Sequence, residues 1–160
     1  MQIREVRDYG LLKVFLYRRI RVQVKILIMG LPGSGKTYLT ERLVPIIGAA
    51  WFNADKIREM ANDWDFSHQG RVRQSNRMKT FADFEKSHGR LVVCDFVCPT
   101  INTRQTFGAD FTVWMDTIKE GRFEDTNKLF ERPKSVDMRI TEWNENNHHD
   151  VAQEVLKVRG

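Results

Sequence analysis

The sequence predicts an α/β fold with a five-stranded, mostly parallel sheet and helices on both faces. Short apolar runs alternate with amphipathic stretches along the chain, the pattern produced by parallel strands and their covering helices. The composition, with 41% hydrophobic and 29% charged residues, is typical of a globular protein, and 160 residues suffice for one domain. We therefore expect one domain at residues 24–160, preceded by a basic extension at residues 1–23.

The first 25 residues account for the net charge of the chain. Residues 1–25 hold seven basic and two acidic side chains, a net charge of +5 that equals the +5 of the whole sequence. The rest is neutral in sum, so nucleic acid is not an expected partner, because phosphate-tracking grooves need clustered lysine and arginine. Residues 1–23 are either an added arm or β-hairpin, or they precede an authentic translation start at Val24 from a GTG codon.

Five apolar runs of four to eight residues predict the strands. In chain order they are Val22–Met29, Ala49–Phe52, Leu91–Val97, Phe111–Met115 and Val136–Ile140.

Four amphipathic stretches predict the helices. The first has Leu39 and Leu43 four residues apart, and Pro45 just beyond predicts its end. The third is the longest, and Gly89 is a plausible stop for it. The predicted helices are Lys36–Val44, Asp55–Trp64, Arg71–Ser87 and Asn147–Val158.

The two middle helices each have an apolar face that we expect to lie inward. In the second helix this face consists of Ile57, Met60, Ala61 and Trp64. In the third helix it consists of Val72, Met78, Phe81, Ala82 and Phe84.

Neither a membrane span nor a disulfide is expected. No apolar stretch approaches the roughly 20 residues that cross a bilayer. If Cys94 and Cys98 both lie on one extended strand, their Cα atoms are about 13 Å apart, too far for a disulfide. Two isolated thiols suit a reducing compartment, so we expect a cytoplasmic protein.

The strongest motif is the glycine-rich segment between the first strand and the first helix, which matches G-x-x-x-x-G-K-[ST] in full. Its glycines let successive backbone N–H groups point at phosphate oxygens, and the following helix adds its positive end. Lys36 should reach the β- and γ-phosphates, and Thr37 should bind Mg²⁺. The expected nucleotide-binding residues are Gly30, Leu31, Pro32, Gly33, Ser34, Gly35, Lys36 and Thr37.

Two carboxylates follow later strands. Asp55, after the second strand, could orient or deprotonate an attacking hydroxyl, with Arg58 one turn on to bind an anionic group; alternatively, Asp55 is a helix N-cap and Arg58 is solvated. Asp95 ends the third strand in a pattern like Walker B, which makes it either a partner of Mg²⁺ or an ordinary turn residue.

With these residues in place, the sequence resembles adenylylsulfate kinases, which transfer the γ-phosphate of ATP to the 3′-hydroxyl of adenylylsulfate. The likeness runs in order from about Lys25 to Leu156. Beyond the glycine-rich loop, it rests on segments similar to the family's Asp-Gly-Asp-Asn-Ile/Val-Arg, Gly-Phe-Ser, Asp-Arg-x-x-Asn-Ile-Arg-Arg, Phe-Ile-Ser-Pro, lid and last-strand motifs. Those segments are Asn53–Arg58, Asp65–Ser67, Gly70–Arg77, Phe96–Pro99, Glu124–Phe130 and Val136–Met138.

The resemblance implies a P-loop kinase fold with a lid at about residues 117–134, ATP and Mg²⁺ as cofactors, and adenylylsulfate as the small-molecule substrate. By resemblance Asp55 is the catalytic carboxylate, Arg58 and Arg71 hold the phosphosulfate, and Phe66 and Phe130 stack on the adenine. A homodimer is compatible with it. The substrate-binding residues that it implies are Asp55, Arg58, Phe66, Arg71, Gln74, Phe96, Val97, Cys98, Lys128 and Phe130.

The sequence departs from the family pattern at several of these positions. Asn53 replaces the first acidic residue, Gln74 replaces an asparagine and Cys98 replaces a serine. Glu124 reverses the charge of a lid arginine, and Asp95 stands where the family usually has a small residue.

Two other functions are therefore kept open. One is a kinase for another hydroxyl acceptor, such as a polynucleotide 5′-hydroxyl or a small metabolite; the other is a nucleotide-binding module without catalysis. Intact Lys36, Thr37 and Asp55 favour an enzyme. For it we expect in-line phosphoryl transfer without a phosphoenzyme, with Lys36 and Mg²⁺ neutralising charge and Asp55 orienting the hydroxyl.

Overall fold

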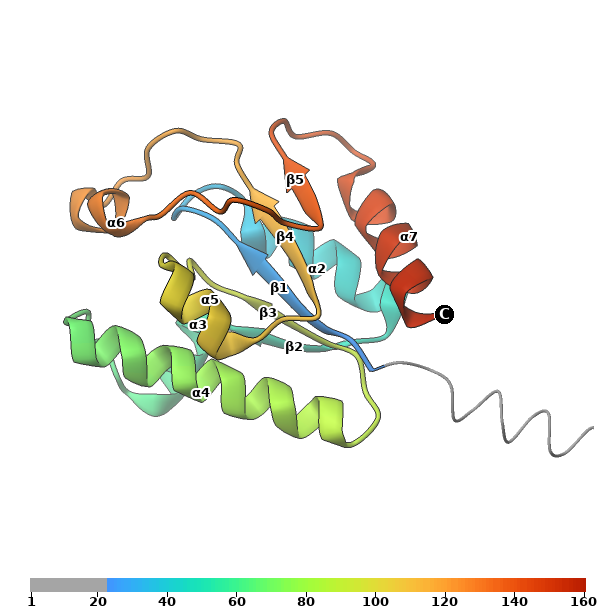
Figure 1. Ribbon diagram of the computed structural model, residues 1–160, viewed down its shortest axis with the longest axis horizontal. Helices are drawn as coiled ribbons and strands as arrows, with labels where there is room; N and C mark the ends of the chain where they lie inside the picture. The colour runs from blue at the N-terminus through green and yellow to red at the C-terminus, as the bar shows by residue number, and fades with distance from the viewer. Residues whose placement is uncertain (1–22) are drawn as a thin grey trace, which may run out of the picture.

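The protein has one parallel sheet with helices on both faces, as seen in the computed structural model, which describes residues 23–160 (Figure 1). The strand order is β2-β3-β1-β4-β5, and every pairing is parallel. This confirms the predicted fold class. The expectations for residues 1–22, including the added arm, lie outside the described residues. The strands are β1 (Lys25–Met29), β2 (Ala50–Asn53), β3 (Val92–Asp95), β4 (Phe111–Met115) and β5 (Met138–Ile140).

Two helix layers cover the sheet, and one short helix stands apart beyond the carboxyl ends of the strands (Figure 1). Helices α2 (Lys36–Ile47) and α7 (Asn147–Arg159) pack together on one face. The opposite face carries α3, α4 and α5. The short outer helix is α6. Their bounds are α3 (Ala54–Ala61), α4 (His68–Ser87), α5 (Ile101–Phe107) and α6 (Glu124–Leu129).

The central strand β1 supplies both cores, because successive side chains of a strand point to opposite faces. Ile26 and Ile28 pack with α2 and α7, whereas Leu27 and Met29 pack with α3, α4 and α5. All five residues of β1 are buried. The loop that leaves β1 therefore starts from a fully buried strand in the centre of the sheet.

Helix α2 is longer than predicted. It continues through Pro45 to Ile47 and ends at Gly48, whose φ of 65° and N–H bond to the Val44 carbonyl close the helix. Pro45 is exposed in the last turn, where its missing N–H removes one backbone hydrogen bond on the solvent side of the helix. The predicted end before Pro45 was therefore wrong.

The apolar faces predicted for α3 and α4 are only partly buried. Met60 is 82% exposed and Trp64 lies beyond the end of α3, whereas Ile57 and Arg58 are the buried residues of that helix. In α4, Met78 and Ala82 are buried, but Val72, Phe81 and Phe84 are exposed. Only the side of α4 that carries Met78 and Ala82 packs against the sheet, so the apolar face predicted for this helix was too wide.

Two local features differ from the sequence expectation after β3. The strand ends at Asp95 rather than Val97, and Cys98 turns the chain with a φ of 47°. Helix α5 was missed, although Thr100 and Thr103 form a capping box at its start. Both cysteines are free and buried. Among residues 23–160, no helix has the length and apolar character that a membrane crossing requires.

We expect Phe107→Ala to lower the free energy of unfolding by about 3–5 kcal/mol, because its fully buried ring fills the core beneath α5. Phe84→Ala should change it by less than about 0.5 kcal/mol, because that ring is 59% exposed. Urea denaturation of both variants measures the difference. Equal losses would mean that Phe84 is a core residue, as its place in the helical pattern indicated.

Candidate active site

The glycine-rich loop requires glycine at two of its positions for steric reasons. Gly30 and Gly35 have φ values of 148° and 92°. A Cβ on Gly30 would lie 2.6 Å from the Met115 carbonyl oxygen, and one on Gly35 would lie 1.7 Å from a ring carbon of Trp143. The chain thus curls tightly from β1 into α2, which directs backbone N–H groups and the positive helix end into the loop.

Lys36 reaches back over this loop. Its Nζ donates a hydrogen bond to the Leu31 carbonyl at 3.0 Å. Burial lowers the pKa of Lys36 to about 8, although the carboxylates of Asp95 and Asp55 oppose that shift. The ammonium group is therefore poorly solvated and lies within the field of both carboxylates.

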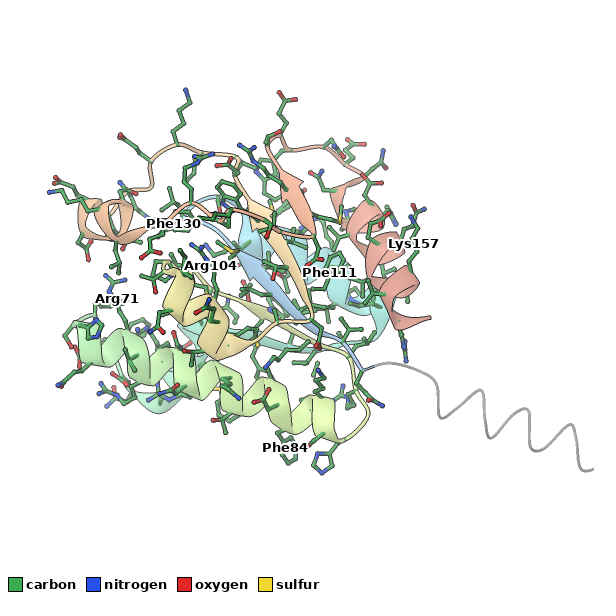
Figure 2. All side chains as sticks on the ribbon, viewed as in Figure 1. Arg71, Phe84, Arg104, Phe111, Phe130 and Lys157 are labelled. Carbon is green, nitrogen blue, oxygen red and sulfur yellow. The ribbon has the colours of Figure 1, made fainter. Side chains whose placement is uncertain are left out.

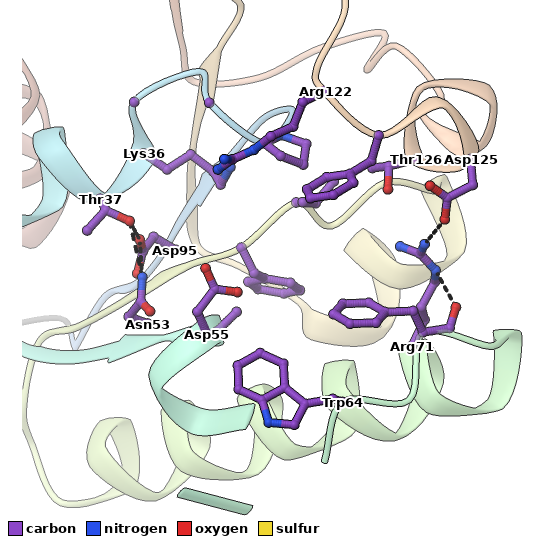
Figure 3. Close-up of a pocket in the computed structure, with 18 of the residues that line it drawn as sticks. Lys36, Thr37, Asn53, Asp55, Trp64, Arg71, Asp95, Arg122, Asp125 and Thr126 are labelled. Atoms are coloured by element: carbon purple, nitrogen blue, oxygen red, sulfur yellow. Dashed lines mark hydrogen bonds and ion pairs between the residues drawn. The ribbon is translucent and has the colours of Figure 1, made fainter. Parts of the chain in front are cut away.

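Asp95 joins the loop helix to two strands (Figure 3). Its Oδ2 accepts hydrogen bonds from Thr37 Oγ1 at 2.9 Å and from Asn53 Nδ2 at 2.8 Å. Its Oδ1 accepts one from Trp51 Nε1 at 2.8 Å. Burial raises the pKa of Asp95, and the hydrogen bonds from Trp51, Asn53 and Thr37 oppose the rise. All three partners donate, which is the arrangement that suits an ionised carboxylate.

The residues present fit Mg²⁺. A hydroxyl and a carboxylate, those of Thr37 and Asp95, are the oxygen ligands that this cation prefers. No group of three or more histidine, cysteine or acidic side chains suited to a metal occurs in residues 23–160.

A cavity of about 800 Å³ lies at the carboxyl ends of the strands (Figure 3). At one end it is bounded by the glycine-rich loop with Lys36 and Thr37, and Asp55 lies beside Asn53 at the start of α3. Asp55 is exposed and Asn53 is the N-cap of α3, so the cap function considered for Asp55 belongs to Asn53. Of the predicted substrate-binding residues, those that line the cavity are Asp55, Phe66, Arg71, Phe96 and Val97.

Arg58 and Gln74, two of the other predicted ligands, act within the protein instead. The Arg58 guanidinium is buried, and its Nη1 donates to the carbonyls of Asp63 and Asp65 at 2.9 and 3.2 Å. Gln74 is buried as well and donates to the Ala54 carbonyl at 3.0 Å. Both hold the segments that carry cavity residues, and neither lines the cavity itself.

The remaining three predicted ligands also lie away from the cavity lining. Cys98 is fully buried, and burial raises the pKa of its thiol to about 12. Lys128 pairs with Glu124 on the exposed surface of α6 at 2.7 Å. Phe130 stacks on Trp114 with the ring centroids 6.4 Å apart and packs against the core. Phe130 therefore does not line the cavity, and its stacking on the substrate stays a prediction.

Sequence reasoning considered Arg122 only as a replacement for the lid arginine, and it missed other residues that line the cavity, namely Tyr38, Trp64, Phe123 and Thr126. Trp64 was expected in the core because of its helical spacing, but α3 ends three residues earlier. For Phe123 the sequence offers only a phenylalanine next to Arg122, and such a pair is too common to predict a binding site.

Helix α6, which lies in the segment predicted to be a lid, is joined to α4 by an ion pair (Figure 3). Arg71 Nη2 lies 2.6 Å from Asp125 Oδ2, and Arg71 Nε donates to the Phe66 carbonyl at 2.9 Å. One guanidinium thus links the lid helix to the loop before α4. Residues of the segment 122–126 line the same cavity as residues at the carboxyl ends of β2 and β3.

A parallel sheet of this strand order, with a glycine-rich turn after its central strand, is the architecture of P-loop kinases, and the protein falls in that class. Within it, the sequence matches the family described as adenylylsulphate kinase over residues 22–139. Because that match covers well over half of the chain, the protein belongs to this family.

Individual relatives are distant. A probable adenylyl-sulfate kinase of Aeropyrum pernix is 27% identical over 92 residues, which cover 52% of this chain and 49% of that protein, so the matched region spans about half of the relative's length. The APS kinase CysC of Mycobacterium tuberculosis, in complex with AMPPNP and APS, has a TM-score of 0.64 at 21% identity, covering 85% of this chain and 96% of that one.

Kinases of other acceptors share the fold. A gluconokinase of Sinorhizobium meliloti has a TM-score of 0.58 at 15% identity, covering 87% of this chain and 93% of that one. Likeness at these identities establishes the fold, and the choice of acceptor must be argued from the cavity.

We expect Gly35→Ala to abolish detectable Mg·ATP binding, because the added methyl group collides with the Trp143 ring and strains the loop backbone. Gly48→Ala is the matched control: it also has a positive φ, of 65°, but its Cβ meets no atom within 4 Å. Calorimetric titration with Mg·ATP measures both. Wild-type affinity in Gly35→Ala would show that the tight turn is not needed.

We expect affinity for Mg·ATP to fall as pH rises above about 8, because the free protein then loses the proton of Lys36 and the phosphates prefer the charged form. The loss should approach tenfold per pH unit in the free protein's titration range. Lys36→Arg, which keeps its charge, should show no such decline. Calorimetry at pH 7.5, 8.5 and 9.5 makes the comparison; parallel declines in both proteins would contradict it.

Proposed function

We propose that the protein is an ATP-dependent kinase that transfers the γ-phosphate to the 3′-hydroxyl of adenylylsulfate. One observation carries this proposal: a single cavity is lined by the phosphate-binding loop, by Asp55, and by Phe66 and Arg71. A carboxylate, an aromatic ring and a guanidinium match an acceptor that combines a hydroxyl, a base and an anionic group. Membership of the adenylylsulphate kinase family supports the same acceptor.

The donor end binds the triphosphate. Backbone N–H groups of residues 30–37 and the positive end of α2 face the phosphate oxygens, and Lys36 adds a charge that can follow the transferred group. Thr37 and Asp95 would hold Mg²⁺, which when bound neutralises charge on the β- and γ-phosphates. Trp51 and Asn53 fix both oxygens of Asp95.

Asp55 positions the hydroxyl group of the acceptor substrate. Asp55 is exposed in the cavity and close enough to Lys36 to favour its charged form. It accepts the hydroxyl hydrogen bond and takes the proton as the oxygen attacks in line, so the γ-phosphate passes directly from ATP to the acceptor oxygen and ADP leaves. No phosphoenzyme forms. The lid, residues 117–134, excludes water during this step.

A kinase for another hydroxyl acceptor is the second candidate. One observation favours it: Arg58, Gln74 and Cys98 are buried and do not line the cavity, although the family resemblance assigns them to substrate binding. ADP release with adenylylsulfate, gluconate, a 5′-hydroxyl oligonucleotide and no acceptor distinguishes the candidates. Stimulation by adenylylsulfate alone supports the proposal. Basal hydrolysis with no stimulation by any acceptor would favour a nucleotide-binding module without catalysis.

The cytoplasmic location and the homodimer stay predictions.

We expect Asp55→Asn to keep its affinity for Mg·ATP and to lose phosphoryl transfer by about 10²-fold or more, because the amide cannot accept the proton. Asp150→Asn, an exposed carboxylate on α7, is the control and should transfer at the wild-type rate. Single-turnover transfer and calorimetry give the two readouts. Transfer near the wild-type rate in Asp55→Asn would remove Asp55 from its assigned role.

A further inference from the structure

The guanidinium of Arg71 lines the cavity, but a carboxylate of the protein already binds it (Figure 3). Its Nη2 lies 2.6 Å from Oδ2 of Asp125, a residue in the first turn of α6. Its Nε donates to the Phe66 carbonyl at 2.9 Å. Asp125 lines the cavity as well, so the ion pair lies within the space that a ligand would enter.

This pair has the features of a contact that a ligand can replace. The Asp125 side chain is 68% exposed, and a single nitrogen–oxygen contact joins it to Arg71. Among residues 23–160, Arg71 is the only ion-pair partner of Asp125. Exposed ion pairs contribute little to stability, because water and salt ions compensate both charges when the pair opens. Opening this pair should therefore leave the fold intact.

The carboxylate of Asp63 shows the contrast. Its oxygens accept from two nitrogens of Arg73 and from one of Arg77, and its side chain is only 11% exposed. None of these three residues lines the cavity. That network holds the loop after α3 in place, whereas the pair of Arg71 and Asp125 is open to solvent and to ligand.

An anionic ligand that binds Arg71 must compete with Asp125. Guanidinium groups bind oxyanions through two parallel hydrogen bonds, either from Nη1 and Nη2 or from Nε and Nη2. Both arrangements use Nη2, which is the atom that Asp125 occupies. Two anions held at one guanidinium also repel each other. The ligand therefore gains its full contact only when the carboxylate moves away.

We propose that Asp125 competes with the anionic group of the acceptor for the guanidinium of Arg71, and that this competition sets the preference of the site for anionic over neutral acceptors. The inference deepens the proposed function and rests on it. Because the anion replaces an existing contact, the exchange lowers the net affinity that it gains. The exchange also removes the ion pair between α6 and α4, so binding of the anion and the position of α6 are linked.

The test compares AMP with adenosine, which lacks only the phosphate, while a non-hydrolysable ATP analogue saturates the donor loop. Asp125→Asn should tighten AMP by at least about fivefold, because the amide does not repel the phosphate, and should leave the affinity for adenosine unchanged. Glu124→Gln is the matched control: it removes the same charge from the same helical turn, but Glu124 pairs with Lys128, so neither affinity should change. Calorimetry measures the affinities, and the thermal midpoint of every variant monitors the fold.

A double-mutant cycle assigns the effect to Arg71. Arg71→Gln should weaken AMP, and adding Asp125→Asn to that variant should change the affinity by less than about twofold, because the contested group is gone. A gain that persists in full without Arg71 would mean that Asp125 acts on the ligand by another route, and it overturns the competition. An equal gain in Glu124→Gln overturns it too, because the effect would then be one of overall charge.

The outcomes separate this competition from the proposed transfer. Tighter binding of AMP by Asp125→Asn, with no turnover of adenylylsulfate by the wild-type protein, keeps the competition and overturns the transfer. Turnover of adenylylsulfate, with an affinity for AMP that Asp125→Asn leaves unchanged or lowers, keeps the transfer and overturns the competition. Binding of AMP that is undetectable in both proteins also overturns the competition.

Discussion

The carboxylate of Asp95 joins the three elements on which the site depends. Its oxygens accept from Thr37 on α2 and from Trp51 and Asn53 on β2, while Asp95 itself ends β3. A buried carboxylate is costly unless it is fully paired, so these contacts are mutually obligatory. They fix the first turn of α2 relative to the strand from which Asp55 projects, and thus the distance between donor and acceptor groups.

The arginines of α3 and α4 have two different roles: some bind other groups of the protein, and one lines the cavity. Arg58 holds the loop after α3 through backbone carbonyls, and Arg73 and Arg77 hold the same loop through Asp63. The pKa of Asp63 is lowered chiefly by its hydrogen bonds from Arg73 and Arg77. Arg71 alone of these arginines lines the cavity. The other arginines of α3 and α4 are therefore engaged within the protein, and the cavity is lined by Arg71 together with Arg122 of the segment before α6.

The parts of the site that depend on local chain geometry could be predicted from the sequence, and the parts that depend on packing could not. The loop from Gly30 to Thr37 follows from spacing, since glycine, lysine and threonine are each needed at fixed offsets. Asp55 and Asp95 follow from the ends of recognisable strands. Phe123 and Phe130 are seven residues apart in one segment, and only the path of the lid over Trp114 decides which ring is buried.

Two departures from the family pattern, Asn53 and Asp95, are structurally linked because they lie opposite each other on neighbouring strands. Asn53 stands where the resembling sequences have an acid, and Asp95 stands where they have a small residue. These two positions are register partners on neighbouring strands, and their side chains are joined by a 2.8 Å hydrogen bond. The carboxylate beside Thr37 is thus kept but is supplied by β3 instead of β2. Because Asn53 cannot be ionised, it donates to Asp95, where a second acid would repel it.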